Sequence, residues 1–342
     1  MNLTRVTARR RTRAIASVIL AGVLFMPTLV PVLASAISRP TLVRTIPVGS
    51  GLLSISSDGT HVWVTGIANG LGHGVAEINA STGRVVRSIS VGMFPLGIDS
   101  DGTHVWVTSL AGFVLELNAS TGRVVRAIFV GFGAAAVSSD GVRVWVGHAT
   151  PPGASPGHTV TEINAATGRV MRTIGVGVNP LAVASDGTHV WVANQGTPSR
   201  PGHSVTEISA ATGRVIRGIG VGEAPSSISA DGTHVWVASP LGMVTEINAA
   251  TGLRVRSIAG PPGLEQISSD GAHVWVTQML GLVFEISAST GRPVTALELG
   301  LVSPAGVSSD GTHVWVTETG IFGPTSAVAE IRIPSPVRRH PV

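Results

Sequence analysis

The sequence predicts an all-β fold, a seven-bladed β-propeller with four antiparallel strands per blade. Seven tryptophans occur in the chain, and each lies in a copy or near copy of the phrase DGTHVWV, 39 to 46 residues after the previous one. Each interval holds four short runs of strand-forming residues, separated by turn residues, with no amphipathic helical stretch between them. A repeat of this length and content is typical of a propeller blade.

The first repeat illustrates the four strands, which we name A to D. Strand A is LLSIS at 52–56, strand B is HVWVT at 61–65, strand C is VAEIN at 75–79 and strand D is RVVRSI at 84–89. Asp-Gly joins A to B, and Ala-Ser-Thr-Gly joins C to D. Both are tight hairpin turns, because glycine supplies the positive φ that such turns require.

The two ends of the repeat region complement each other. Residues 41–49, TLVRTIPVG, match strand D, yet no strands A to C precede them, whereas the seventh repeat has strands A to C and stops at Pro334. We therefore expect the N-terminal strand to close the last blade, which hides a sheet edge and completes a ring. Residues 335–342 are predicted to be a disordered tail.

The N-terminus resembles an export signal. A stretch rich in arginine precedes an apolar run from Ala14 to Leu33, and the small-x-small sequence Ala34-Ser35-Ala36 follows. The sequence thus predicts a signal peptide over 1–36, a propeller over 37–334 and a secreted or cell-envelope location. Adjacent arginines also resemble a twin-arginine signal. The alternative is an uncleaved membrane anchor, since about 20 apolar residues span a bilayer.

Composition excludes several classes of function. The chain has no cysteine, lysine or tyrosine, which removes disulfides, thiol nucleophiles and cysteine-ligated metals. Five of its 23 arginines precede residue 37, so the remainder balances 18 arginines against 19 acidic residues. Without a concentrated basic face we expect no nucleic-acid partner. We expect a monomer that contacts a membrane only through the signal segment, if that segment is uncleaved.

The repeat also resembles known families. HVWVT followed by VTEINAATGRVVRTIxVG is similar to the YVTN-type repeat of exported bacterial and archaeal surface-layer propellers, with Trp in place of Tyr and the Asn present only as Asn194. DGTHVWVT is similar to the DGxxWFTE repeat of virginiamycin B lyase-like propellers, with its Glu present only as Glu318. Both resemblances imply the propeller fold. The second implies a divalent-metal-dependent lyase.

Residues that recur in every blade are predicted to be structural. The tryptophans should pack between blades. A histidine two residues before six of them should serve structural hydrogen bonds, with Arg143 in its place in the third blade. The strand-C glutamates face strand-D arginines such as Arg84 and Arg87, which indicates cross-strand charge pairs that blunt exposed outer edges. These glutamates are Glu77, Glu116, Glu162, Glu207, Glu246, Glu285 and Glu330.

Function is expected on the face where the repeat varies. The A-to-B and C-to-D turns are nearly constant, whereas the B-to-C and D-to-A connections on the opposite face vary in length and residues. One column on that face lies two residues after each WV and is predicted to form an asymmetric ligand-binding ring. Its members are Gly66, Ser109, His148, Asn194, Ser239, Gln278 and Glu318. The alternative is that loops simply start with polar residues.

Further departures from the repeat fall on the same face. Glu265 and Gln266 start strand A of the sixth blade, where other blades have small or apolar residues, and strand A is expected to line the central channel. Asn179 and Glu223 lie in nearby D-to-A connections. Long B-to-C loops at 149–158 and 194–203, which carry His158 and His203, are expected to form a wall over one side.

Three functions remain open from the sequence. The first is an exported module that binds an extracellular ligand or protein through the variable face. The second is a lyase or hydrolase with Mg²⁺ or Ca²⁺ in the central funnel and Glu318 and His148 as candidate catalytic residues, although no local ligand spacing supports a metal site or another cofactor. The third is a passive envelope or surface-layer module. No GxSxG, P-loop or HExxH pattern indicates another chemistry.

Overall fold

The computed structural model describes residues 39–68, 74–92, 94–149, 155, 157–300, 303–318 and 326–334. The predicted signal peptide (1–36) and tail (335–342) lie outside these residues. Every regular element in the described part is a β-strand, so the all-β prediction is confirmed there. A search of the same residues found no helix with the length and apolar character needed to cross a membrane. Residues 39–342 form one compact unit, to which the description below applies.

Five sheets have four strands each, and one has seven. The four-stranded sheets are β5–β8 (Pro95–Ser100, His104–Ser109, Phe113–Asn118, Val124–Phe129), β9–β12 (Ala134–Ser139, Arg143–His148, Thr159–Asn164, Val170–Gly175), β13–β16 (Pro180–Ser185, His189–Thr197, Arg200–Ser209, Val215–Gly220), β17–β20 (Ser227–Ala230, His234–Ser239, Met243–Asn248, Arg254–Ala259) and β21–β24 (Leu264–Ser269, His273–Gln278, Leu282–Ser287, Pro293–Glu298). The seven-stranded sheet has the order β25 (Pro304–Ser309), β26 (His313–Glu318), β27 (Ser326–Arg332), β1 (Thr41–Ser57), β2 (His61–Ala68), β3 (Gly74–Asn79) and β4 (Val85–Ser90).

The seven-stranded sheet exists because β1 takes part in two pairings. Its first half, residues 41–49, lies antiparallel to β27, with Thr45 opposite Ala329. Its second half, residues 50–57, lies antiparallel to β2, with Ser56 opposite Trp63. The sequence predicted two separate strands here, and the structure joins them without a break. The pairing with β27 confirms that residues 41–49 complete the sheet of the C-terminal strands.

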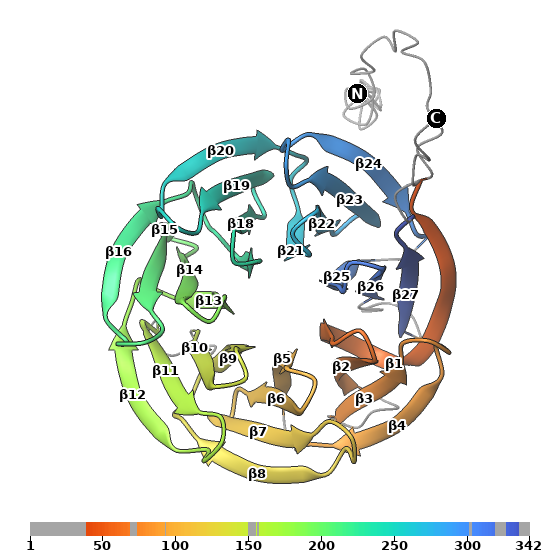
Figure 1. Ribbon diagram of the computed structural model, residues 1–342, viewed down its shortest axis with the longest axis horizontal. Helices are drawn as coiled ribbons and strands as arrows, with labels where there is room; N and C mark the ends of the chain where they lie inside the picture. Colours follow the sequence, from red (N-terminus) through yellow and green to blue (C-terminus); the bar gives the residue numbers. More distant parts are fainter. Residues whose placement is uncertain are drawn as a thin grey trace, which may run out of the picture. The chain divides into compact units, whose positions relative to one another are not determined.

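The sheets stand around a central axis (Figure 1). The first strand of each repeat lies nearest the axis, as β5, β9, β13, β17, β21 and β25 show, and the outer strands β4, β8, β12, β16, β20 and β24 run around the circumference. Strand A therefore surrounds the centre, as predicted.

The tryptophans pack between neighbouring sheets. Trp63 on β2 belongs to one cluster with Ile98 and Val105 of the next sheet. Trp315 on β26 packs with Leu52 and Val62 across the junction between the two ends of the chain. All seven indoles are fully buried. This confirms the packing role that repetition predicts, since a buried indole offers no stacking surface to a ligand.

The repeated charged residues form a network that ties sheets together. Arg87 Nε lies 2.7 Å from Glu77 Oε2, and His61 bridges Glu77 Oε1 at 3.9 Å and Asp58 Oδ2 at 3.6 Å. The Arg87 guanidinium also donates to the carbonyl of Thr121 in the next sheet. Glu77 is buried, and burial raises the pKa of its carboxyl despite the nearby Arg87.

Two details of the predicted charge pairs are wrong. The seven strand-C glutamates are buried and do not lie on exposed outer edges. Glu77, for example, faces inward because it contacts residues of both strand B and strand D, which lie on either side of strand C in the sheet. In addition, Arg87 and not Arg84 lies opposite Glu77 in the ladder.

The predicted loop at 194–203 is also different in the structure. Strand β14 continues to Thr197 and β15 begins at Arg200, with Gly196 opposite Pro201, so the segment is an extended hairpin. Gly196 has a φ of 77°, which glycine accommodates at the irregular register there. The other long loop, at 149–158, lies mostly outside the described residues.

Candidate functional site

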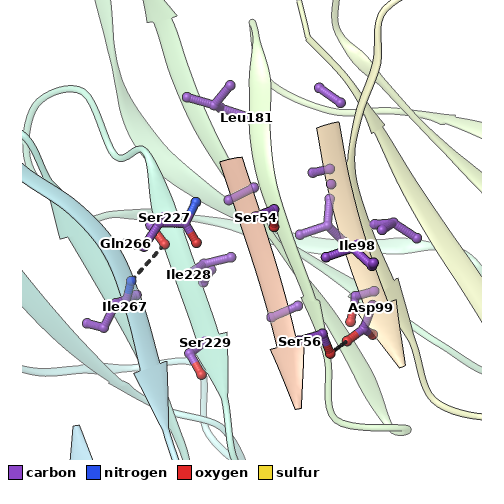
Figure 2. Close-up of a pocket in the computed structure, with 18 of the residues that line it drawn as sticks. Ser54, Ser56, Ile98, Asp99, Leu181, Ser227, Ile228, Ser229, Gln266 and Ile267 are labelled. Carbon is purple, nitrogen blue, oxygen red and sulfur yellow. Dashed lines mark hydrogen bonds between the residues drawn. The ribbon is translucent and has the colours of Figure 1, made fainter. Parts of the chain in front are cut away.

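A cavity of about 740 Å³ occupies the centre of the ring. It is lined almost wholly by the inner strands β1, β5, β9, β13, β17 and β21 (Figure 2). Its lining residues fall into three levels according to their place along strand A. We call these the upper, middle and lower levels, the upper one being nearest the variable loops.

The upper level consists of the residues at the second position of strand A in the first six repeats, of which Ser226 directly precedes β17: Leu53, Leu96, Ala135, Leu181, Ser226 and Glu265. The middle level consists of the third residue: Ser54, Gly97, Ala136, Ala182, Ser227 and Gln266. The lower level consists of the fifth residue: Ser56, Asp99, Ser138, Ala184, Ser229 and Ser308. Figure 2 shows this order, with Leu181 above Gln266 and Asp99 below.

The spacing of the levels has a structural cause. Side chains of a strand alternate between its two faces, but most inner strands carry an irregularity near their start, for example between Pro95 and Ile98. The second and third residues can then both line the cavity. The fourth residue, such as Ile98, is buried and packs between sheets.

The lower level is a ring of serine hydroxyl groups interrupted by one carboxylate, that of Asp99, and by the methyl group of Ala184. Ser56 Oγ accepts the N–H of Ser100 at 3.1 Å, and Ser138 Oγ accepts the N–H of Ser185 at 3.0 Å. Asp99 has the same role at its junction, where Oδ2 accepts the N–H of Ser139 at 2.7 Å. Its Oδ1 also accepts from Ser56 Oγ at 3.2 Å. Each of these residues therefore joins one inner strand to the next.

Asp99 is the residue that sequence reasoning missed. It is half-buried, and withdrawal from water raises the pKa of its carboxyl to about 6, although the N–H of Ser139 and the hydroxyl of Ser56 counteract this. The signal was present in the repeated phrase, where the second copy reads IDSDGTHVW and the first reads ISSDGTHVW. Serine would supply the same acceptor, so the backbone does not require a carboxylate here.

Glu265 and Gln266 lie on the cavity wall, where strand A was expected to place them. The Glu265 side chain is exposed to the cavity. The surrounding walls nevertheless remove enough water to raise the pKa of its carboxyl. Within the described part of the chain, its carboxylate has neither an ion pair nor a hydrogen bond. Gln266 is anchored through its backbone N–H, which donates to Thr277 Oγ1 at 3.0 Å and leaves the side chain free to face the cavity.

The charged residues that line the cavity are anionic. Among the described residues that line it there is no arginine or histidine, and Asp99 and Glu265 are its charged members. Further carboxylates lie directly behind the serines at the lower end. Ser100 Oγ donates to Asp58 Oδ2 at 3.0 Å, and Ser139 Oγ donates to Asp101 Oδ2 at 3.1 Å. These charges favour a cation in the cavity and disfavour an anion.

The predicted ring of column residues is placed differently. Ser109, His148, Asn194, Ser239 and Gln278 are all buried, and their polar atoms serve the loops around them. His148 Nε2 lies 2.8 Å from Thr161 Oγ1, and burial lowers the pKa of its imidazole. Gln278 Nε2 donates to the carbonyl of Pro262 at 2.9 Å and its Oε1 accepts the N–H of Leu280 at 3.0 Å.

The remaining buried members act in the same way. Asn194 Nδ2 donates to Thr206 Oγ1 at 2.9 Å, and Ser239 Oγ donates to the carbonyl of Glu223 at 2.6 Å. Ser109 Oγ accepts the N–H of Ala111 at 3.2 Å. These side chains bind neighbouring loops or strands, and none of the five is among the described residues that line the cavity. They stand at or near the end of strand B, one strand further from the axis than strand A.

Four other candidates have different surroundings. Gly66 lies opposite Leu52 and Gly74 in its sheet. Glu318 is half-buried and lies opposite Pro304 at the end of β26. The side chain of Glu223 is exposed. Asn179 Nδ2 donates to Gln195 Oε1 at 3.0 Å, and Gln195 lines the cavity.

Asn179 also has a conformational role. Its φ of 54° is shared by the residues before proline in three other D-to-A connections, Phe94, Ala224 and Ser303. Asparagine tolerates this left-handed conformation better than most residues. A turn requirement therefore accounts for Asn179 without a ligand.

A metal centre has no ligand set in this part of the molecule. A search of the described residues found no group of three or more His, Asp or Glu side chains placed to hold a metal ion. The predicted Mg²⁺ or Ca²⁺ site in the funnel stays a prediction.

No family model and no curated protein matches this sequence. Among solved structures the chain is similar to the hydrazine synthase of Kuenenia stuttgartiensis, with a TM-score of 0.68 and 17% identity over 83% of this chain and 96% of that chain. At that identity the likeness shows the fold alone, and it agrees with a β-propeller. The fold is suited to a binding or scaffold module, and it leaves the particular activity open.

Proposed function

We propose that this chain is an exported seven-bladed propeller that binds a small ligand or protein at its variable face, with the central cavity as the binding site. One observation carries the proposal. Residues that build the ring repeat from sheet to sheet, whereas Asp99, Glu265 and Gln266 depart from the repeat and line one cavity. Departures scattered at random over the ring would have no reason to share a surface.

The blade count follows from strand β1. Division of the seven-stranded sheet at the middle of β1 yields two blades of four strands, β25–β27 with residues 41–49 and residues 50–57 with β2–β4. With the five four-stranded sheets this makes seven blades, in agreement with the seven copies of the tryptophan phrase.

Export is supported by the composition of residues 1–36, in which a basic stretch, an apolar run and Ala34-Ser35-Ala36 follow in order. The protein recovered from the cell envelope or medium should begin near Ile37. Edman sequencing or intact mass measurement of that protein tests this, and a chain that retains residues 1–36 in the membrane fraction would favour the anchor instead.

The binding role is tested with a variant that restores the repeat at the cavity wall. Glu265→Ala with Gln266→Ala places the residues of Ala135 and Ala136 on β21, so the fold should be kept. Wild type and variant, each beginning at residue 37, are immobilised and exposed to concentrated culture medium and envelope extract. Partners recovered by the wild type alone support the proposal.

The matched control for this experiment is Glu298→Gln, which removes an exposed carboxylate at the end of β24 away from the cavity lining. It should recover the same partners as the wild type. Equal recovery by the Glu265→Ala, Gln266→Ala protein would contradict the proposed site.

A further inference from the structure

We propose that the central cavity binds a linear aliphatic diamine or polyamine, with one ammonium group at the level of Asp99 and another near Glu265. The inference rests on the proposed binding function and names the class of ligand. It follows from the three levels of the cavity wall, which offer oxygen acceptors at the lower level, an apolar collar at the upper level and one carboxylate at each.

The lower level suits an ammonium group because five of its six residues, all except Ala184, carry oxygen acceptors. A carboxylate has about four acceptor positions and a hydroxyl has two. The partners of Asp99 are the Ser56 hydroxyl and the backbone N–H groups of Ser139 and Ser100. Ser138 and Ser229 each accept one N–H, at 3.0 Å in both cases. The remaining lone pairs match the three donors of an ammonium group.

The upper level suits a methylene chain with a second charge. Leu53, Leu96 and Leu181 line the cavity there, and Glu265 is the one charged residue at that level among those that the structure describes. Burial of methylene groups against leucine is favourable by the hydrophobic effect. The Glu265 carboxylate has no partner in the described part of the chain, so it can accept the second ammonium without breaking an existing contact.

The two carboxylates are spaced for an elongated ligand. Asp99 lies on β5 and Glu265 on β21, on opposite sides of the axis in Figure 1. Their levels are three strand positions apart, which corresponds to roughly 10 Å along the axis at the usual rise of a strand. Because the two strands also face each other across the cavity, the full separation is larger than this axial component. An elongated diamine can span it, whereas a compact monocation reaches one carboxylate at a time.

Other ligand classes fit less well. An anion would meet two carboxylates and no cationic side chain among the described lining residues. A divalent metal ion needs several oxygen ligands that converge at about 2.0–2.6 Å, and the two carboxylates lie at separate levels. A neutral polyol would use the serine hydroxyls but would leave the charge of Glu265 and Asp99 unmatched.

The proposal predicts how pH affects binding. The Asp99 carboxyl, with its pKa raised to about 6, loses its charge as the pH falls from 7.5 to 5. The charged groups packed around it are Asp101 on its own blade, which is paired with His104, and Asp58 behind Ser100 on the preceding blade. Glu265 across the cavity also has a raised pKa. Amine binding should therefore weaken over this range.

The experiment is isothermal titration calorimetry of the chain beginning at residue 37. The probes are 1,8-diaminooctane, spermidine, 1-aminooctane and the neutral 1,8-octanediol, with CaCl₂ and MgCl₂ in separate runs. We expect the diamine and spermidine to bind more tightly than the monoamine, and the diol to give no measurable heat. Asp99→Ser and Glu265→Ala should each weaken diamine binding by about tenfold or more, the factor expected when one charge-assisted contact is lost.

Two controls keep the result interpretable. Asp99→Ser retains an acceptor for the N–H of Ser139, as Ser138 does for Ser185, so its fold can be verified by circular dichroism and its melting temperature. Glu298→Gln should leave diamine affinity unchanged.

Several results would overturn the proposal. The octanediol could bind as tightly as the diamine, the Asp99→Ser protein could retain wild-type affinity, or Ca²⁺ or Mg²⁺ could bind with the same dependence on Asp99 and displace the diamine. The proposed function fails separately. If no amine binds but the wild type still recovers a partner that the Glu265→Ala, Gln266→Ala protein does not, the binding role stands and the ligand class is wrong.

Discussion

At the scale of single residues, Asp99 shows how one departure from a repeat adds chemistry without a change in structure. The same N–H bond between neighbouring inner strands is made by a serine hydroxyl at most other junctions, at 3.0–3.1 Å, and by the Asp99 carboxylate at 2.7 Å. A carboxylate held away from water is costly unless its charge is matched. Because serine would accept the same backbone N–H, the presence of Asp99 at this position indicates a role beyond that hydrogen bond.

Replacement of Asp99 by serine should therefore stabilise the protein at neutral pH. The folded-state pKa of about 6 lies above the ordinary value of 3.8. Well below pH 3.8 the carboxyl is protonated in both the folded and the unfolded state and does not affect stability. As the pH rises from 3.8 toward 6 the unfolded state loses this proton more readily than the folded state, so the free energy of unfolding falls, and it levels off above pH 6. The melting temperature of Asp99→Ser should exceed that of the wild type at pH 7.5, and this difference should shrink toward pH 4.

The comparison has a clear contrary outcome. If the ionised Asp99 were instead stabilised by its hydrogen bonds, its pKa would be lowered, and Asp99→Ser would melt below the wild type at pH 7.5. Differential scanning calorimetry at three pH values separates the two cases.

Gln278 illustrates the opposite relation between a variable residue and function. It differs from its counterparts in other blades, yet both ends of its amide bind backbone groups of the surrounding loops. Gln278→Ala would leave the carbonyl of Pro262 and the N–H of Leu280 without these partners. We expect the free energy of unfolding, measured by urea denaturation, to fall by about 1–3 kcal/mol. Ligand binding should be unchanged under conditions in which the variant is fully folded. Loss of ligand binding by a fully folded variant would instead support the predicted ligand-binding ring.

At the scale of elements, the junction between β13 and β17 differs from the other junctions of the ring. Elsewhere a serine, or Asp99 at the junction between β5 and β9, accepts an N–H from the next inner strand. A second serine donates to an aspartate of the preceding sheet, as Ser269 does to Asp231 at 2.7 Å. Here Ala184 and Ala230 occupy the two positions, and the contact is apolar, through a cluster that includes Trp191 and Ile228. This junction lacks both polar connections among the residues described.

Restoring the serines should strengthen this junction. In the Ala184→Ser, Ala230→Ser protein, one hydroxyl can accept the N–H of residue 230 and the other can donate to Asp186. Two such bonds should add about 1–2 kcal/mol to the free energy of unfolding. Amide hydrogen exchange of β13 and β17 should slow by a corresponding factor. Unchanged exchange would mean that the apolar packing already holds this junction as firmly as the others.

At the scale of the whole molecule, the ring is closed by the chain's own N-terminal strand. Ile46 belongs to the core at this junction, and Arg44 forms an ion pair with the buried Glu330 on β27. A chain that begins at Ser50 would leave β27 as an unpaired edge and Glu330 without its arginine.

The truncated chain should unfold at a markedly lower urea concentration than a chain that begins at Arg39, because its free energy of unfolding should be lower by several kcal/mol. It should also aggregate as the protein concentration rises. Addition of a synthetic peptide of residues 39–49 should restore part of the stability. Equal stability of the two chains would show that the N-terminal strand packs against the ring but is not needed to close it.

The extent to which the sequence predicts this molecule differs between fold and site. The strands, the turns and the pairing of 41–49 with the C-terminal strands are readable because seven copies of one pattern repeat the same information. The burial of Glu77 was not readable, since a strand alternates in the same way whether its polar side faces water or a neighbouring arginine. His148 and Gln278 looked like surface residues because sequence alone does not show that the loops fold back over them.

Asp99 was overlooked for a related reason. It lies inside the repeated phrase, so it reads as a variant of a structural serine, and only the three-dimensional arrangement shows that this position faces a cavity shared with Glu265. Glu265 and Gln266 were readable because they replace small or apolar residues on a strand whose place at the axis follows from the fold.

The central claim is that the departures from the repeat on the inner strands create the binding site. It is tested by a variant that removes all of them together, Asp99→Ser with Glu265→Ala and Gln266→Ala, whose melting temperature is measured at pH 7.5 with and without 1,8-diaminooctane. We predict that the diamine raises the melting temperature of the wild type and leaves that of the variant unchanged. An equal rise in both proteins would contradict the account.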